Sequence, residues 1–278
     1  MAYVDINYEK EDNGIAWITV NRPHVYNAMR ARTNQELVHA LRDAGSDNNV
    51  RVVVLSGTGP NAFGAGQDQS FDNPDPTDEV GHTQADATLG GEIGNVSQVV
   101  RDIPQPVIAM VDGFVIGASH ILAYHCDLTI ASERSTFGQT GPRVGSPAAG
   151  HGVSYLASAV GQKKAREIWY TSRQYSASDA LQMGLCNSVV HHEKLEEEVR
   201  SFCADIINNS PIILQMEKIG FNEYADLINP EKSPFQRYYG KDYSASDESV
   251  ERRSAFLERR PIDQSKNIPY AKIPTSGE

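Results

Sequence analysis

Short apolar runs that end at turn-forming residues recur along the first half of the chain, and they restrict its fold more than any other feature. Four runs, at residues 15–20, 52–56, 107–111 and 128–131, have the length of a β-strand. The run at 52–56 is apolar in all but its last position, which is typical of a strand buried on both faces. Glycine, proline, asparagine or aspartate follows each of the first three runs and predicts where the strand ends.

Helical patterns lie between these runs and dominate after them. Thr33, with Glu36 three residues later, forms a capping-box pattern that predicts a helix starting at Thr33. Apolar side chains at helical spacing predict helices over residues 162–170 and 195–207, and Ser176 opens another. Repeated β/α units followed by helices predict a layered α/β domain with a helical C-terminal part.

Two segments fit neither pattern. Residues 70–92 are rich in Asp, Pro, Thr and Gly and too polar for a core. We expect either a mobile loop beside a functional site or a tolerated insertion there. The stretch from about residue 232 is charged and aromatic, with Tyr238, Tyr239 and Tyr243. It has too few apolar residues to fold alone, so we expect it to pack on the body or on a neighbouring subunit.

The bulk composition excludes several classes of protein. The 278 residues are 40% apolar and 22% charged, as in ordinary globular proteins, and no apolar run is long enough to predict a membrane-spanning helix. The N-terminus shows no secretory signal. The formal net charge of −11 argues against nucleic-acid binding, which needs a basic face. Three widely spaced cysteines form no C-x-x-C pair, so we expect neither disulfides nor a metal site, and a cytoplasmic location.

Two glycine-marked segments each follow a predicted strand. Residues 62–68 contain Gly64 and Gly66, and residues 113–120 lead into a predicted helix. Glycine permits tight turning and leaves backbone N–H groups uncovered, and the first N–H groups of a helix lack intrahelical acceptors. Placed side by side, the two turns would form an oxyanion hole. Glycine turns without any catalytic role are also common in α/β folds, and neither segment has the spacing of a nucleotide-binding motif.

Over roughly residues 4–265 the chain resembles the crotonase (enoyl-CoA hydratase/isomerase) superfamily. The two turns, Asn21-Arg22-Pro23 with Asn27-Ala28, and the order of the segments carry the resemblance. It implies a ββα spiral core over residues 1–200 and a helical trimerisation region over residues 201–278, whose tail packs on a neighbouring subunit. It also implies a homo-trimer or a dimer of trimers that acts on a CoA thioester without a tightly bound cofactor.

Two further segments, residues 137–146 and 160–170, resemble one branch of that superfamily more closely. This branch holds 1,4-dihydroxy-2-naphthoyl-CoA synthase and 2-ketocyclohexanecarboxyl-CoA hydrolase. The resemblance implies chemistry at a C–C bond. Our first interpretation is a hydrolase that opens the ring of a cyclic β-ketoacyl-CoA or a related β-diketone. The alternatives are the ring-closing synthase and a non-catalytic CoA-binding protein.

The resemblance implies that the N–H groups of Gln67 and Ala118 are the oxyanion donors. The family usually has glycine at positions 118 and 119, so the side chains of Ala118 and Ser119 are expected to narrow the pocket. Hydratases of the family use two glutamates as acid and base on water. This chain has Ile121 and Gly141 at those positions, which argues against simple hydration of an enoyl-CoA.

The resemblance also implies two binding regions. In this branch a glycine at position 141 leaves room for a bicarbonate ion that replaces the carboxylate base, and donors suited to an anion surround it. The expected anion-binding residues are Gln139, Thr140, Gly141 and Trp169. The residues expected to contact the substrate or CoA are Arg22, Ala65, Gly66, Asp68 and Gly117. By position alone, Trp169 would be a core residue and Gln139 a loop residue.

Three more residues complete the implied catalytic set. Ser146 matches a serine that contacts the acyl part of the substrate in this branch. The branch has an aspartate at the position of Ala148, and His151 is the candidate to replace it, because its ordinary pKa of about 6.5 suits acid–base work. A tyrosine from a neighbouring subunit is expected at Tyr243, with Tyr239 as the alternative.

Overall fold

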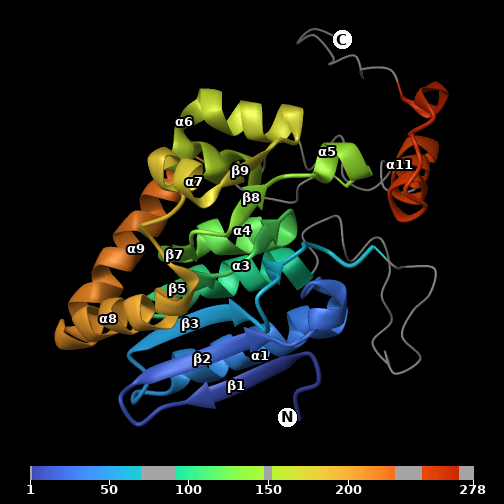
Figure 1. Ribbon diagram of the computed structural model, residues 1–278. Helices are drawn as coiled ribbons and strands as arrows, with labels where there is room; N and C mark the ends of the chain where they lie inside the picture. The colour runs from blue at the N-terminus through green and yellow to red at the C-terminus, as the bar shows by residue number, and fades with distance from the viewer. Residues whose placement is uncertain (1, 70–91, 147–151, 229–245, 269–278) are drawn as a thin grey trace, which may run out of the picture.

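The computed structural model describes residues 2–69, 92–146, 152–228 and 246–268 (Figure 1). Its strands form two sheets, one of six strands in the order β1-β2-β3-β5-β7-β10 and one of four in the order β4-β6-β8-β9. The N-terminal strands lie at one end of the molecule, and helices α6 and α7 lie at the other. The predicted α/β class and the spiral arrangement of the core are confirmed.

The larger sheet contains all four strands that the sequence predicted. Its strands are β1 Ile6–Lys10, β2 Ile15–Val20, β3 Val52–Gly57, β5 Val107–Val111, β7 Leu128–Ser132 and β10 Ser188–Val190. β1 runs antiparallel to β2, and the other pairs are parallel. The first five residues of β3 are buried, because helices or strands cover both faces of the parallel part of the sheet.

The smaller sheet consists of strands of three residues each. They are β4 Ala62–Gly64, β6 Phe114–Ile116, β8 Thr136–Gly138 and β9 Gln174–Ser176. β4, β6 and β8 each follow a strand of the larger sheet, so the chain repeats a long strand, a short strand and a helix. Three residues are too few to show an alternating pattern, which is why the sequence did not predict these strands separately.

Helices fill the intervals between the strands and form the C-terminal part. They are α1 Ala31–Ser46, α3 Glu92–Asp102, α4 Ala118–His125, α5 Gly141–Val144, α6 Gly152–Thr171, α7 Ala177–Met183, α8 Leu195–Asn208, α9 Pro211–Ile228 and α11 Asp247–Leu257, with short 3-10 turns η1 Pro23–Val25, η2 His192–Lys194 and η3 Gln264–Lys266. The predicted helices over residues 162–170 and 195–207, and the one opened by Ser176, are confirmed. A break at Gly161, with φ 77°, divides α6.

Two apolar clusters form the core. The larger one involves the helices α1, α3 and α4, and the smaller one lies where α8 packs on the larger sheet. The smaller cluster joins strand residues such as Val54 and Ile108 to Leu195, Val199 and Cys203 of α8. The predicted division at residue 200 therefore falls inside a helix that packs on the core sheet.

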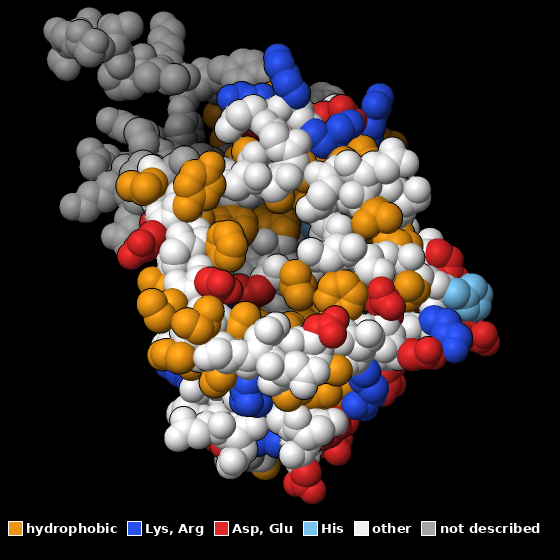
Figure 2. Space-filling model, turned by 90° about the vertical axis from the view of Figure 1, so that its left-hand side faces the viewer, with side chains coloured by type: hydrophobic (Ala, Val, Ile, Leu, Met, Phe, Trp, Pro, Cys, Tyr) orange, Lys and Arg blue, Asp and Glu red, His pale blue; other side chains and the backbone are white. Residues whose placement is uncertain are grey.

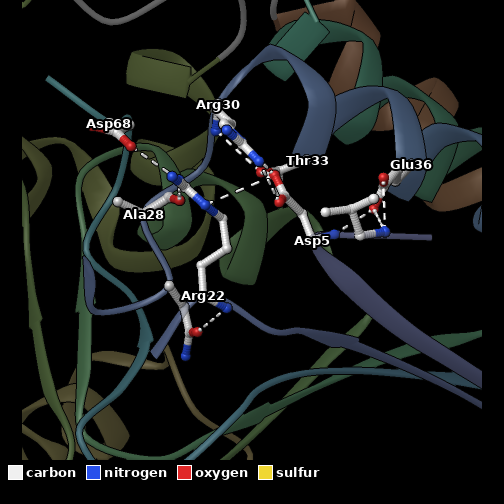
Figure 3. A network of polar contacts seen from close by, with 9 residues as sticks. Asp5, Arg22, Ala28, Arg30, Thr33, Glu36 and Asp68 are labelled. Atoms are coloured by element: carbon white, nitrogen blue, oxygen red, sulfur yellow. Dashed lines mark hydrogen bonds and ion pairs between the residues drawn. The ribbon is translucent and has the colours of Figure 1, made fainter. Parts of the chain in front are cut away.

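The start of α1 differs from the prediction. The helix begins at Ala31, and Arg30 rather than Thr33 is its N-cap residue. The Thr33 hydroxyl donates to Asp5 at 2.6 Å, and Glu36 accepts from the Asp5 backbone N–H at 2.8 Å (Figure 3). The side chains of the expected capping box thus bind the segment that leads into β1. Contacts across the chain override a local signal here.

None of the helices in the described ranges has the length and apolar character needed to cross a membrane.

Candidate active site

The two glycine turns of the sequence lie against each other. The first follows β4, with Gly66 at φ 95°, and the second follows β6, with Gly117 at φ 60°. A Cβ atom added to Gly66 would lie 3.0 Å from the Ile116 carbonyl oxygen and 3.3 Å from the Ala118 nitrogen. A side chain at position 66 would therefore push the turns apart. The fold therefore places the turn at Gly66, which precedes Gln67, against the first residue of α4, Ala118.

The first turn is held by backbone bonds to the segment before α1. Met29 donates its N–H to the Gly66 carbonyl at 2.8 Å, and Asp68 donates its N–H to the Met29 carbonyl at 2.8 Å. The Ser119 hydroxyl accepts the Gly66 N–H at 3.1 Å. Ser119 is buried, so its side chain ties the two turns together and does not narrow the pocket, contrary to our expectation.

Arg22 and Asp68 support this turn from within. The Arg22 guanidinium donates to Asp68 at 2.9 Å and to the Ala28 carbonyl at 2.5 Å, and it lies 3.8 Å from Asp5 (Figure 3). Arg22 is only 6% exposed and Asp68 only 8%. These contacts assign both side chains to the scaffold of the turn, which corrects the expectation that they bind the substrate or CoA. Of the other residues expected to bind it, Ala65 is exposed, Gly117 is half-buried and Gly66 is buried.

Helix α4 and strand β8 hold the second turn. Ala118 is the first residue of α4 and Gly117 is its N-cap. Within the described residues the Ala118 N–H meets no acceptor, as expected at a helix start. The Gly117 carbonyl accepts from the Ile121 N–H at 3.0 Å and from the Gln139 side-chain amide at 3.2 Å. This carbonyl and the Ala118 N–H belong to one planar peptide unit, so the two bonds also fix the direction of the N–H.

His120 supports Gln139 and was not assigned a role by the sequence. Its Nδ1 lies 3.4 Å from the Gln139 side-chain nitrogen, and the ring is 1% exposed. Burial lowers the pKa of His120 to about 4, so the ring is neutral near pH 7. The amide nitrogen of Gln139 thus lies between this ring and the Gly117 carbonyl, to which it donates. We therefore assign Gln139 to the support of the turn rather than to the binding of an anion.

Neither of the two positions that hold the hydratase glutamates has a carboxyl group here. Ile121 is half-buried on α4. A Cβ atom added to Gly141 would lie 2.4 Å from the Ser146 carbonyl oxygen, so the local backbone excludes any side chain there. The same atom would lie 3.7 Å from the Trp169 ring. Neither isoleucine nor glycine has a side chain that can transfer a proton, so these two residues cannot serve as the acid and base that hydration needs.

Trp169 has a buried N–H donor, and the six-membered part of its ring lies beside Gly141. The residue is 6% exposed, and among the described residues no acceptor reaches its indole N–H. A buried donor without an acceptor costs about 1–3 kcal/mol, so such a group commonly has a functional reason. Thr140 is the half-buried N-cap residue of α5, next to Gly141. Three of the four expected anion-binding residues therefore lie together.

The remaining expected residues divide into two groups. Ser146 is half-buried and donates its N–H to the Gly141 carbonyl at 2.9 Å. Beside it, Ser249 of α11 donates its hydroxyl to the Gly145 carbonyl at 2.8 Å, so the C-terminal helix packs next to this segment. His151, Tyr239, Tyr243 and the predicted loop up to residue 91 lie outside the described residues.

Comparisons with known proteins agree with this architecture. The family model for enoyl-CoA hydratase/isomerase matches residues 10–267. A structure described as a probable enoyl-CoA hydratase from Mycobacterium thermoresistibile is 30% identical, with a TM-score of 0.68 over 80% of this chain and 89% of that one. An enoyl-CoA hydratase from Mycobacterium avium subsp. paratuberculosis is 25% identical, with a TM-score of 0.78 over 94% and 99%. A methylmalonyl-CoA decarboxylase, 24% identical, shares the fold with a TM-score of 0.82 over 95% and 98%.

Proposed function

We propose that this chain, which belongs to the enoyl-CoA hydratase/isomerase family of the crotonase superfamily, is a hydrolase that opens the ring of a cyclic β-ketoacyl-CoA. One observation carries the proposal. The paired turns stand beside Ile121 and Gly141, where neither position has a carboxyl group to activate water for hydration. Stabilisation of a thioester enolate is the chemistry that such a site retains.

In the proposed reaction, water adds to the ring ketone of the substrate. The bond between the former ketone carbon and the α-carbon then breaks, and its electron pair moves onto the thioester as an enolate. The N–H groups of Gln67 and Ala118 stabilise the enolate oxygen. A proton returned to the α-carbon completes the addition of one water molecule, and the product is an open-chain acyl-CoA with a new carboxylate.

The residues proposed for proton transfer come from the resemblance, and the proposed anion site comes from the groups around position 141. Ser146 orients the acyl group, and His151 and Tyr243 are the proposed proton-transfer residues. Thr140, Gly141 and Trp169 fit a small oxyanion, because the buried Trp169 N–H has no acceptor within the described residues. Bicarbonate bound there would supply the base that the missing carboxylate supplies in hydratases.

The ring-closing synthase is the second candidate, and the buried Trp169 N–H without an acceptor in the described residues favours it as well. In that reaction the enolate attacks a second carbonyl group instead of being protonated, so one oxyanion hole serves both directions. The two candidates differ in the fate of the substrate. Ring opening adds one water molecule, whereas ring closure with dehydration removes one.

Mass spectrometry of the products separates the candidates. The protein is incubated with 2-ketocyclohexanecarboxyl-CoA and, separately, with succinylbenzoyl-CoA, each with and without bicarbonate. We expect the first substrate to gain one water molecule while its thioester stays intact. A gain of water with release of free CoA would instead be thioester hydrolysis and would contradict the proposal. Conversion of only the second substrate would favour the synthase, and tight CoA binding without turnover of either would favour a binding protein.

We also propose that the molecule is a homo-trimer or a dimer of trimers whose subunits meet at α9. This helix exposes a row of large apolar side chains, and the face of the molecule on that side carries many hydrophobic groups around a hollow (Figure 2). The exposed residues are Ile212, Ile213, Met216, Ile219, Phe221, Tyr224 and Leu227. On the opposite side, Lys218 pairs with Asp127 at 2.8 Å and fixes α9 to its own chain. A monomer rarely leaves such a face uncovered.

Light scattering after size-exclusion chromatography tests this assembly. The wild type is expected at three or six times the chain mass, and Phe221→Asp is expected to lower that number. Tyr170→Asp is the control, because Tyr170 is 73% exposed on another helix. A monomeric wild type, or an unchanged assembly in Phe221→Asp, would show that subunits do not meet at α9.

A further inference from the structure

Three metal-ligating side chains meet where strands β7 and β10 end. They are Glu133, His191 and His192, and their ligand atoms all lie within 4.8 Å of one another. β7 and β10 are parallel, with Val190 opposite Ser132, and the Glu133 N–H donates to the Val190 carbonyl at 2.9 Å. The sheet therefore holds the two segments in register. Residues far apart in the sequence become neighbours, which no local motif could have indicated.

The geometry of the three groups suits one small ion. His192 Nδ1 lies 2.9 Å and His191 Nε2 lies 3.7 Å from the same Glu133 oxygen. Ligand atoms around a tetrahedral zinc ion lie roughly 3.4 Å apart, given bonds of about 2.1 Å. Neighbouring side chains of an extended strand point to opposite faces. Here the 3-10 turn η2 begins at His192, and the two rings lie 4.3 Å apart with an interplanar angle of 37°.

The surrounding charges favour a cation. Glu193 places a carboxylate oxygen 3.8 Å from His191 Nδ1. Asp112 interacts with His192 and forms an ion pair with Arg134. The nearby Lys194 pairs with Glu197 at 2.7 Å. Three carboxylates, including Glu133, thus face one guanidinium.

We propose that Glu133, His191 and His192 bind one divalent transition-metal ion of the zinc type at the surface. Two imidazoles and one carboxylate are ligands that zinc accepts, with water in the open position, whereas magnesium prefers oxygen ligands. The ion would replace the hydrogen bond between His192 and Glu133. It would then join η2 and the edge strand β10 to the end of β7. The site shares no residue with the candidate active site and is independent of the proposed function.

Isothermal titration calorimetry of the metal-stripped protein with zinc chloride tests the proposal. We expect one zinc ion per chain and a higher melting temperature in the presence of zinc, because the ion binds only the folded chain. Glu133→Gln and His192→Ala should each weaken binding at least about tenfold, since even residues that merely orient a ligand have effects of that size. His24→Ala removes an exposed histidine elsewhere and should bind zinc as the wild type does.

Two results would overturn the site. One is zinc binding of unchanged affinity and stoichiometry in the triple variant Glu133→Gln, His191→Ala, His192→Ala, with circular dichroism showing that it is folded. The other is magnesium chloride competing equally well with zinc. The cysteines Cys126, Cys186 and Cys203 are all buried, so the native chain offers zinc no accessible thiol as an alternative ligand. Zinc anomalous scattering from crystals would locate the ion directly.

Discussion

The turn at Gly66 and the turn at Gly117 each follow a short strand of the smaller sheet, β4 and β6, but different parts of the chain hold them. The first depends on the segment between β2 and α1 and on the pair of Arg22 and Asp68, which lie 46 residues apart in sequence. The second depends on the helix that it opens and on Gln139 of the next β-strand unit. One of the two proposed oxyanion donors is thus positioned by a buried ionic network and the other by a helix start.

Because the supports differ, damage to each should change a different property of the protein. The ionic network also holds the start of α1, so damage to it should lower the stability of the whole N-terminal layer. The helix start is local, so damage to it should lower turnover while the fold survives.

The largest effect is expected from Asp5→Asn. Asp5 is buried, accepts from Arg30 at 2.7 Å and 2.8 Å and from Thr33, and lies 3.8 Å from Arg22. Removing its charge leaves two buried guanidiniums short of a partner, which should cost about 3–5 kcal/mol of unfolding free energy. Urea unfolding at pH 7 measures the loss, and Asp12→Asn, at an exposed position, is the control.

The same variant has a characteristic pH dependence. Burial raises the pKa of Asp5, but the hydrogen bonds from Arg30 and Thr33 outweigh it, and the net pKa lies below the ordinary 3.8. A depressed pKa stabilises the fold above the unfolded-state value and loses that contribution as the pH falls through the folded-state value. The gap in stability between wild type and Asp5→Asn should therefore narrow below about pH 4. A constant gap down to acid unfolding would contradict the ionic role.

Ala118→Pro should have the next largest effect. Proline suits the first position of a helix, so α4 should form, but the variant lacks the N–H that we propose as a donor to the enolate. Loss of one such donor costs about 3–4 kcal/mol of barrier, or roughly a hundredfold to a thousandfold in kcat. Steady-state kinetics with the substrate found by mass spectrometry measures it. Ala118→Gly keeps the N–H and should remain active, and a fully active Ala118→Pro would rule out this donor.

Gln139→Leu should have a smaller effect on the same donor. The Gly117 carbonyl would keep its bond from Ile121 and lose the one from the amide. We expect kcat to fall about tenfold, which corresponds to about 1.4 kcal/mol, with little change in KM, because the direction of the N–H matters most in the transition state. An anion-binding role would instead abolish bicarbonate stimulation, which kinetics at varied bicarbonate would reveal.

Ser119→Ala should have the smallest effect. The Gly66 N–H would lose the hydroxyl that accepts it at 3.1 Å, while the backbone bonds of the first turn remain. The expected loss of unfolding free energy is about 1 kcal/mol, measured by urea unfolding. Ser119→Gly, the residue usual in the family at this position, should behave in the same way. A gain in turnover from either change would instead support the expectation that Ser119 narrows the pocket.

The sequence predicted the repeating elements of this protein well. The structure contains the predicted strands over residues 15–20, 52–56, 107–111 and 128–131 and the predicted helices after residue 162. Apolar periodicity is a local property of the sequence, and burial of the apolar side chains stabilises the element that it predicts. It also showed that position 121 is apolar and position 141 has no side chain, and this excludes the hydratase acid and base. The adjacency of the two turns could be inferred only through the resemblance.

Tertiary structure decided where side chains in the turns point. Ser119 binds the other turn, Arg22 and Asp68 pair in the interior, and Gln139 holds a peptide. Thr33 and Glu36 likewise bind Asp5 just before β1, and Thr33 accepts the Arg30 N–H as the third residue of α1 rather than as its N-cap. The physical reason is the same in each case. Turns and helix ends lack a repeating pattern, so the direction of a polar side chain depends on which distant donor or acceptor the fold brings within hydrogen-bonding distance.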